Sequence, residues 1–363
     1  MGLGLLYEFI YLIVVTVILF QVLKNPAQRL NKRRRNAPIS PLCTVVIVLL
    51  VLFIGFRPRP VGADTCQYMD VYSYFRGMPF VYDDKTDNPL FDNLMRYIGS
   101  SDLDISCLFI IMASIYFGCM YIACRKLFSD NQNIAFFSYL IAFSTFSYGV
   151  NGMKAGAAAS IFLVALAYKD KLLLSILLAL LSLGFHHSMI MVVYAYIIAL
   201  FFRKTKWYFY GWLFSLIIAA LHIGYFQTLF ASYADDSGAS YLIGNGRADY
   251  ITGFRLDFIL YSAIPVIIGY YVLFKWHLRN SMFEIWLRMY LLTNSIWMLC
   301  MYASFTNRIA YLSWFMLPII ILYPFYAMSE VPGRLMIGRK VAIGQAAFTL
   351  LIFFFYYGNL FKL

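Results

Sequence analysis

Residues 172–202 read LLLSILLALLSLGFHHSMIMVVYAYIIALFF, and this uncharged stretch decides the class of fold. A helix crosses ~30 Å of hydrocarbon with about 20 apolar residues, so the stretch indicates membrane-spanning helices. The whole chain agrees, because 62% of its 363 residues are hydrophobic and only 13% are charged, whereas soluble domains contain about 25% charged residues. We therefore predict an all-α polytopic membrane protein, which excludes a cytosolic enzyme and a nucleic-acid-binding protein.

Apolar runs along the rest of the chain predict further spans, about twelve transmembrane helices in all. The predicted spans are 5–23, 41–56, 105–124, 134–150, 153–168, 172–187, 188–202, 208–226, 257–274, 283–303, 308–328 and 341–358. They must be helical, because backbone at membrane depth has to satisfy its own hydrogen bonds. Without a strong internal repeat or a low-complexity linker, residues 1–363 are interpreted as a single integral membrane domain.

The distribution of Lys and Arg predicts the orientation of these spans. A basic cluster at 24–35 follows the first span, and alternation from there places most of the 29 Lys and Arg on the cytoplasmic side. Both termini then face outside, and the first apolar segment is retained rather than cleaved. Two longer extracytoplasmic loops, 57–104 and 227–256, hold most of the acidic residues. We therefore expect the chemistry to take place at the outer surface.

The first candidate segment, FRPRPVGADTCQYMDVY at 56–72, directly follows a predicted span. Pro prevents a helix from continuing, so Arg57 and Arg59 are expected on a stiff extended segment at the membrane edge. Arg can bind phosphate through two parallel hydrogen bonds, and Asp64 and Tyr68 follow closely. The alternative is an interfacial anchor, in which Arg snorkels and Tyr belongs to the aromatic belt.

Two further basic residues stand at the predicted outer starts of spans, each close to an Asn. Asn151 and Lys154 precede the small-residue run AGAAAS, and Asn307 stands next to Arg308. A Lys in a membrane is costly and tends to mark a site, whereas Gly and Ala allow close helix packing. Both basic side chains could instead snorkel at a helix end.

The segment GFHHS at 184–188 separates two very apolar runs at a predicted outer junction. Imidazole titrates near pH 6.5, so His186 can accept a proton from a hydroxyl near neutral pH. His187 and Ser188 are further candidates for substrate contact. The alternative is an interfacial His pair bound to backbone carbonyls.

The remaining polar residues indicate neither a metal site nor a disulfide framework. Six Cys are scattered without a CxxC pair, so we expect no metal and no cofactor. Arg288 lies inside a predicted span one helical turn after Glu284, and we interpret this pair as structural.

Taken in this order, the four segments resemble the EpsG/Wzy-like family of polysaccharide polymerases. That family has an Arg before a Gly-x-Asp element with a Tyr, then Asn-x-x-Arg, Phe-His-x-Ser and Asn-Arg elements. The matching residues here are Arg57 or Arg59 with Gly62, Asp64 and Tyr68; Asn151 with Lys154; Phe185, His186 and Ser188; and Asn307 with Arg308. The resemblance covers about residues 50–315. Lys154 departs from the usual Arg, which keeps the charge but loses the bidentate fork.

The resemblance implies that repeat units carried on undecaprenyl diphosphate are joined at the outer face of the bacterial cytoplasmic membrane. Glycosyl transfer would be metal-independent, with His186 as proton acceptor, Asp64 as fallback base and cationic side chains on the diphosphate. The implied partners are the lipid-linked oligosaccharide and the bilayer, a chain-length-determining membrane protein is a further candidate, and no nucleic acid is expected. The substrate-binding candidates are Arg57, Arg59, Tyr68, Asn151, Lys154, His187, Ser188, Asn307 and Arg308.

Three other functions remain open. A flippase or transporter of lipid-linked sugars would need a charged path near the midplane, whereas the candidates here lie at span ends. A membrane acyltransferase acting on polysaccharide would also use an intramembrane His, but the short inner loops show no acyl-donor site. An O-antigen ligase shares the same chemistry, and the sequence does not separate it from a polymerase.

Overall fold

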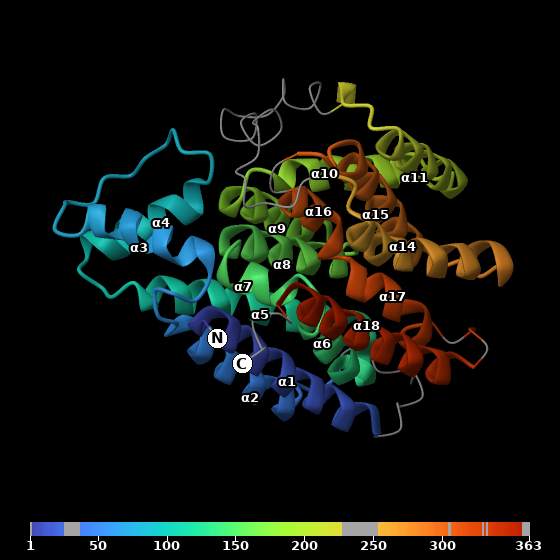
Figure 1. Ribbon diagram of the computed structural model, residues 1–363, viewed down its shortest axis with the longest axis horizontal. Helices are drawn as coiled ribbons and strands as arrows, with labels where there is room; N and C mark the ends of the chain where they lie inside the picture. Colours follow the sequence, from blue (N-terminus) through green and yellow to red (C-terminus); the bar gives the residue numbers. More distant parts are fainter. Residues whose placement is uncertain are drawn as a thin grey trace. The chain divides into compact units, whose positions relative to one another are not determined.

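In the computed structural model, the described residues form helices and no strands (Figure 1). The structure describes residues 2–24, 37–226, 253–303, 306–328, 330–331 and 333–357. The chain divides into two compact units, Met1–Met189 with Leu322–Leu363 and Ile190–Ile321, and each is described by itself. The predicted all-α class is therefore confirmed for the described residues.

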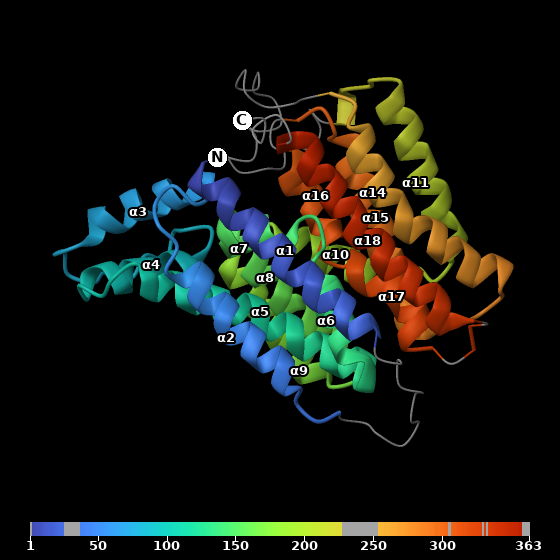
Figure 2. The ribbon, with the colours of Figure 1, turned by 60° about the horizontal axis from the view of Figure 1, so that its bottom comes forward.

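The first unit is built from long apolar helices and two shorter polar ones. Its helices are α1 (Leu3–Lys24), α2 (Pro41–Gly55), α3 (Ala63–Phe75), α4 (Pro89–Ser100), α5 (Ser106–Phe128), η1 (Ser129–Asn131), α6 (Gln132–Leu140), α7 (Thr145–Val150), α8 (Met153–Ala167), α9 (Leu172–Phe185) and α18 (Arg334–Tyr357). The polar helices α3 and α4 lie side by side at one end of this unit (Figures 1 and 2). The apolar helices form the body of the unit. This is expected, because a helix satisfies the hydrogen bonds of its own backbone.

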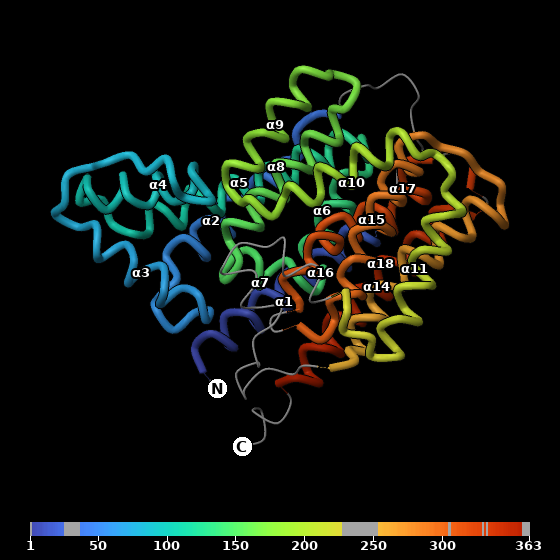
Figure 3. The backbone as a smooth tube through the Cα atoms, turned by 90° about the horizontal axis from the view of Figure 1, so that it is seen from above, coloured from blue at the N-terminus to red at the C-terminus, as the bar shows by residue number. Residues whose placement is uncertain are grey.

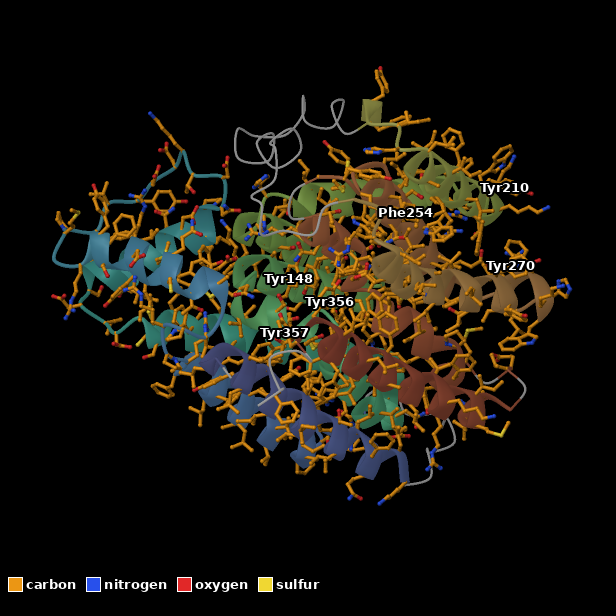
Figure 4. The ribbon with its side chains drawn as sticks, viewed as in Figure 1. Tyr148, Tyr210, Phe254, Tyr270, Tyr356 and Tyr357 are labelled. Carbon is orange, nitrogen blue, oxygen red and sulfur yellow. The ribbon has the colours of Figure 1, made fainter. Side chains whose placement is uncertain are left out.

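Helix α8 lies against both α5 and α9 (Figure 3). Its residues are buried along almost its whole length. Small residues at its start permit this close packing. A Cβ added at Gly152 would lie 2.8 Å from Cδ1 of Tyr148, and Gly156 lies directly against the backbone oxygen of the same residue. Tyr148, labelled in Figure 4, is only 5% exposed. The chain therefore folds tightly at the junction between α7 and α8.

The second unit is held together by a buried polar network as well as by apolar contacts. Its helices are α10 (Met189–Phe201), α11 (Thr205–Ala220), α14 (Leu256–Tyr270), the π-helix η2 (Tyr271–Lys275), α15 (Ser281–Leu299), α16 (Thr306–Trp314) and α17 (Leu317–Tyr326). The first residue of α10 and the last residues of α17 belong to the first unit. Asn294 donates to Oγ of Ser262 at 3.1 Å and to Oγ of Ser313 at 3.0 Å, and accepts from the indole of Trp212 at 2.8 Å. These bonds link four helices, as polar side chains do between transmembrane segments.

The predicted pair Glu284–Arg288 is present in the second unit as a structural contact. Arg288 is 5% exposed, and its guanidinium lies 3.6 Å from the Glu284 carboxylate. The same guanidinium donates to the backbone oxygen of Arg203 at 3.1 Å and to Oγ1 of Thr205 at 3.3 Å. The pair therefore ties α15 to the start of α11.

Each predicted span contains a helix, but two of the apolar runs are broken. The run 134–150 divides into α6 and α7, and the run 308–328 divides into α16 and α17. Within the described residues, five segments are long and apolar enough to cross a membrane, and four shorter apolar helices accompany them. The five segments are Leu3–Lys24, Ser106–Leu140, Leu256–Lys275, Thr306–Tyr326 and Arg334–Tyr357. The count of about twelve crossings therefore stays a prediction, as does the layout of the loops.

The structure describes the first of the two predicted outer loops but little of the second. The loop 57–104 contains the helices α3 and α4. The sequence did not predict these helices, because neither contains a long apolar run. Residues 227–252 of the second loop lie outside the described residues, as does most of the basic cluster at 24–35.

Candidate functional site

The chain turns back on itself after α2 instead of running on in extended form. The backbone N–H of Arg57 donates to the carbonyl of Ile54, and that of Val61 donates to the carbonyl of Pro58 at 3.0 Å. Gly62 follows with φ +87°, and a Cβ at this position would lie 2.5 Å from Oδ1 of Asn151. The predicted stiff extended segment is therefore wrong. Pro58 does end the helix, but the missing side chain of Gly62 lets the chain turn against the α7–α8 junction.

Arg57 is buried and bonded within the protein. Only 3% exposed, it donates from Nε to Oγ1 of Thr65 at 3.0 Å, from Nη1 to the carbonyl of Ile54 at 3.0 Å and from Nη2 to that of Val150 at 3.3 Å. Its guanidinium carbon lies 3.7 Å from the ring centre of Phe109. Burial lowers the pKa of Arg57 to about 10, which leaves it charged at neutral pH. This arginine joins the end of α2 to α3, α5 and α7.

Arg59 has the opposite environment, two residues further along the chain. Its side chain is 58% exposed, and it forms an ion pair with Asp70 of α3 at 2.6 Å. Such a surface pair contributes little to stability, because solvent and salt screen it. Of the two arginines that compete for one family position, Arg59 is therefore the one a solvent-borne anion can reach.

Asp64 and Tyr68 on α3 are both anchored to Asn151. The hydroxyl of Tyr68 donates to the backbone oxygen of Asn151 at 2.9 Å, and the backbone N–H of Asp64 donates to its Oδ1 at 3.4 Å. All three residues are half-buried. The spacing of four residues between Asp64 and Tyr68 places them on the same face of the helix, turned toward the start of α8.

Phe91 of α4 links this group to Lys154. Its ring centre lies 5.8 Å from the ring of Tyr68 and 5.8 Å from the ammonium nitrogen of Lys154. Among the described residues Lys154 forms no ion pair, so its charge faces an aromatic ring rather than a carboxylate. The half-buried ammonium at the start of α8 therefore has no carboxylate partner among the described residues, which suits an anionic ligand.

The GFHHS segment ends α9 and contacts the first turn of α4. The backbone N–H of His187 donates to Oδ1 of Asn88 at 3.1 Å, and a Cβ at Gly184 would lie 2.6 Å from Leu90. His186 is the extended residue directly after α9, and its Nδ1 lies 3.2 Å from Oγ of Ser188. The first turn of α4 therefore lies next to both the His pair and the Lys154 group.

We define the candidate site as Asp64, Tyr68, Asn151, Lys154, His186, His187 and Ser188, together with Phe91 and Asn88. The first seven were predicted from the sequence, whereas Phe91 and Asn88 were missed. Asn followed by Pro is a usual start of a helix, so the pair Asn88–Pro89 could have predicted the start of α4.

Asn307 and Arg308 belong to the second unit, in the first turn of α16. The hydroxyl of Thr306, at the start of this helix, accepts from the indole of Trp297 at 2.9 Å. This bond fixes the start of α16 on α15 within the second unit. That Arg308 binds the same diphosphate as Lys154 and the arginines of the first unit stays a prediction.

Comparison with known proteins gives one match. The model of the EpsG family matches residues 41–362, which is most of the chain. No curated protein and no solved structure matches it. Together with the apolar helices, the match makes the chain a multi-pass membrane protein. The chain belongs to the EpsG family, whose members are polysaccharide polymerases.

Proposed function

We propose that this protein joins oligosaccharide repeat units carried on undecaprenyl diphosphate, at the outer face of the bacterial cytoplasmic membrane. The reaction is a metal-independent glycosyl transfer that lengthens a surface polysaccharide. The observation that carries the proposal is the candidate site, where a cation, a His pair and several sugar-compatible polar groups gather at one end of the first unit. A polymerase needs these groups together at a membrane surface.

The bond changes assign a task to each type of side chain. A hydroxyl oxygen of the acceptor sugar attacks the anomeric carbon of the donor, and the bond from that carbon to the diphosphate oxygen breaks. The diphosphate leaves with the electron pair and carries growing negative charge, which the ammonium of Lys154 stabilises. The hydroxyl proton passes to His186.

Ser188 controls which nitrogen of His186 can accept that proton. Its backbone N–H donates to Nδ1 at 3.4 Å and its hydroxyl lies 3.2 Å from the same nitrogen, so Nδ1 accepts and carries no proton in this arrangement. Nδ1 is then the nitrogen of the neutral imidazole that takes up the proton, as a general base does. Asp64 is the fallback base, because its place on α3 next to Asn151 puts it in the candidate site.

Aromatic and amide groups of the site are suited to hold sugars. Tyr68 and Phe91 offer ring surface beside Lys154, and Asn151 offers an amide between α3 and α8. Arg59 supplies a second, solvent-exposed cation for the diphosphate. Its ion pair with Asp70 of α3 holds the Arg59 side chain in place. The buried Arg57 holds α3 against the end of α7 through its bonds to Thr65 and Val150.

The test is the length distribution of surface polysaccharide in a strain that lacks this protein. Loss of long chains with single capped repeats retained supports a polymerase. Loss of both products would indicate a flippase or an earlier step, and long lipid-linked chains that are no longer attached would indicate a ligase. A chelator added to a membrane assay should leave chain growth intact, and full inhibition would contradict the metal-independent mechanism.

A further inference from the structure

The first unit contains a cavity at the end opposite the candidate site. It has a volume of about 160 Å³ and is lined by Ile122, Arg125, Lys126 and Tyr168. These residues come from the last turns of α5 and the residue after α8, whereas Lys154 stands at the start of α8. A rise of ~1.5 Å per residue puts Tyr168 roughly 20 Å along the axis from Lys154. The cavity is therefore separate from the candidate site.

Two cations, Arg125 and Lys126, line this cavity, and a third, Lys171, lies near the ring of Tyr168, which also lines it. The ammonium nitrogens of Lys126 and Lys171 lie 5.1 Å and 5.9 Å from the ring centre, and Nε of Arg125 donates to the carbonyl of Ala37 at 2.8 Å. Among the described residues, none of the three cations forms an ion pair. Lys169 differs, because it lies 3.3 Å from the carboxylate of Asp170.

The cavity is open to an anion, and its surroundings are apolar. One water needs only about 10–15 Å³ of such cavity volume, so about 160 Å³ holds a phosphate with room for water. Ile122 of its lining is 43% exposed, and Leu172 and Leu173, which follow Lys171 in the chain, are 70% and 72% exposed. A free phosphate would use the cations alone, whereas a phospholipid would also cover these exposed aliphatic side chains.

Ordinary roles for these residues explain only part of the arrangement. Cations in the last turn of a helix interact favourably with its carbonyl end, which accounts for Arg125 and Lys126 on α5. That role does not account for Lys171, which precedes a different helix, or for the cavity beside Arg125 and Lys126. It also leaves the aromatic ring shared by two ammonium groups unexplained.

We propose that this cavity binds the phosphate of an anionic phospholipid headgroup, with the acyl chains lying along Ile122 and the start of α9. Lys126, Lys171 and Arg125 contact the phosphate, and Tyr168 holds the two ammonium groups apart. The Lys and Arg distribution predicts that this end faces the cytoplasm, so the lipid comes from the inner leaflet. The proposal does not depend on the polymerase reaction.

The experiment compares lipid binding by the purified full-length protein and three variants. Native mass spectrometry counts bound phosphatidylglycerol, with phosphatidylcholine as the zwitterionic probe, for wild type, Lys126→Gln with Lys171→Gln, Lys169→Gln and Tyr168→Leu. Each Lys near an anionic lipid contributes ~1 kcal/mol, or about a fivefold change in affinity. We expect the double variant to bind phosphatidylglycerol roughly tenfold or more weakly, and Lys169→Gln to bind as wild type does.

Several outcomes would overturn the proposal. Unchanged phosphatidylglycerol binding in the double variant would do so, and so would an equal loss in Lys169→Gln, because the effect would then be general charge. Displacement of the lipid by glycerol phosphate at equal concentration would assign a free-phosphate site instead. Tyr168→Leu keeps every charge, so its expected loss of binding tests the site even if the double variant fails to fold.

Discussion

Replacing Arg57 should damage the fold of the protein, whereas replacing Arg59 should damage only its reaction. The two arginines lie in the same FRPRP segment, but Arg57 is 3% exposed and Arg59 has a side chain that is 58% exposed. The pair therefore offers matched variants, Arg57→Ala and Arg59→Ala, with the same change of residue at neighbouring positions.

The magnitude for Arg57→Ala follows from its contacts. The guanidinium donates to three oxygen atoms, each such bond from a charged group being worth about 1.5–3 kcal/mol, and it stacks on Phe109 for roughly another 1–2 kcal/mol. Removing the charge also removes the cost of its burial, and the terms are not additive. We expect a net destabilisation of ~2–4 kcal/mol.

The assay is thermal unfolding of purified protein in detergent, followed by size exclusion, alongside polysaccharide length in a complemented deletion strain. Arg57→Ala should lower both the melting temperature and the yield of folded protein. Arg59→Ala should keep the wild-type melting temperature and shorten the polysaccharide. Equal melting temperatures for the two variants, or a stable Arg57→Ala protein that simply fails to polymerise, would refute the assignment of Arg57 as a structural residue.

Three more predictions concern the candidate site and the turn at Gly62 that positions it. His186→Ala should reduce chain growth ~10²–10⁴-fold while the protein still inserts, whereas His187→Ala should retain activity; the reverse result in the polysaccharide length assay would move the assignment by one residue. Gly62→Ala should be destabilising by ~1–3 kcal/mol more than Gly77→Ala in a melting experiment, because both glycines have positive φ but only Gly62 has no room for a Cβ; equal effects would remove the packing argument. Lys154→Arg should keep polymerisation and Lys154→Met should lose it at unchanged expression, since the charge above Phe91 is the feature that matters; an active Lys154→Met protein would exclude this Lys from diphosphate binding.

Alternation of apolar runs predicted that several distant polar segments lie at the same ends of their spans. Asn151, Lys154 and His186 all stood at predicted outer ends of spans, and the structure brings their segments together around α4. That this end faces outside stays a prediction. Phe91 and Asn88 could not be found in the same way, because α3 and α4 have too few apolar residues to stand out as spans. Their positions depend on packing against one another and on the end of α9.

The burial of Arg57 and the exposure of Arg59 could not be predicted from the segment itself, because both arginines follow the same span and alternate with Pro. Arg57 is buried through a contact with a residue 93 positions away, where its guanidinium donates to the backbone oxygen of Val150. That contact needs the turn at Gly62, which brings the chain back against Asn151. The same turn aims α3 so that Asp64 and Tyr68 bond to Asn151. A buried arginine and a glycine thus position the residues of the candidate site without occupying it. Loss of activity on replacing either one is therefore evidence of catalysis only when the fold is measured as well.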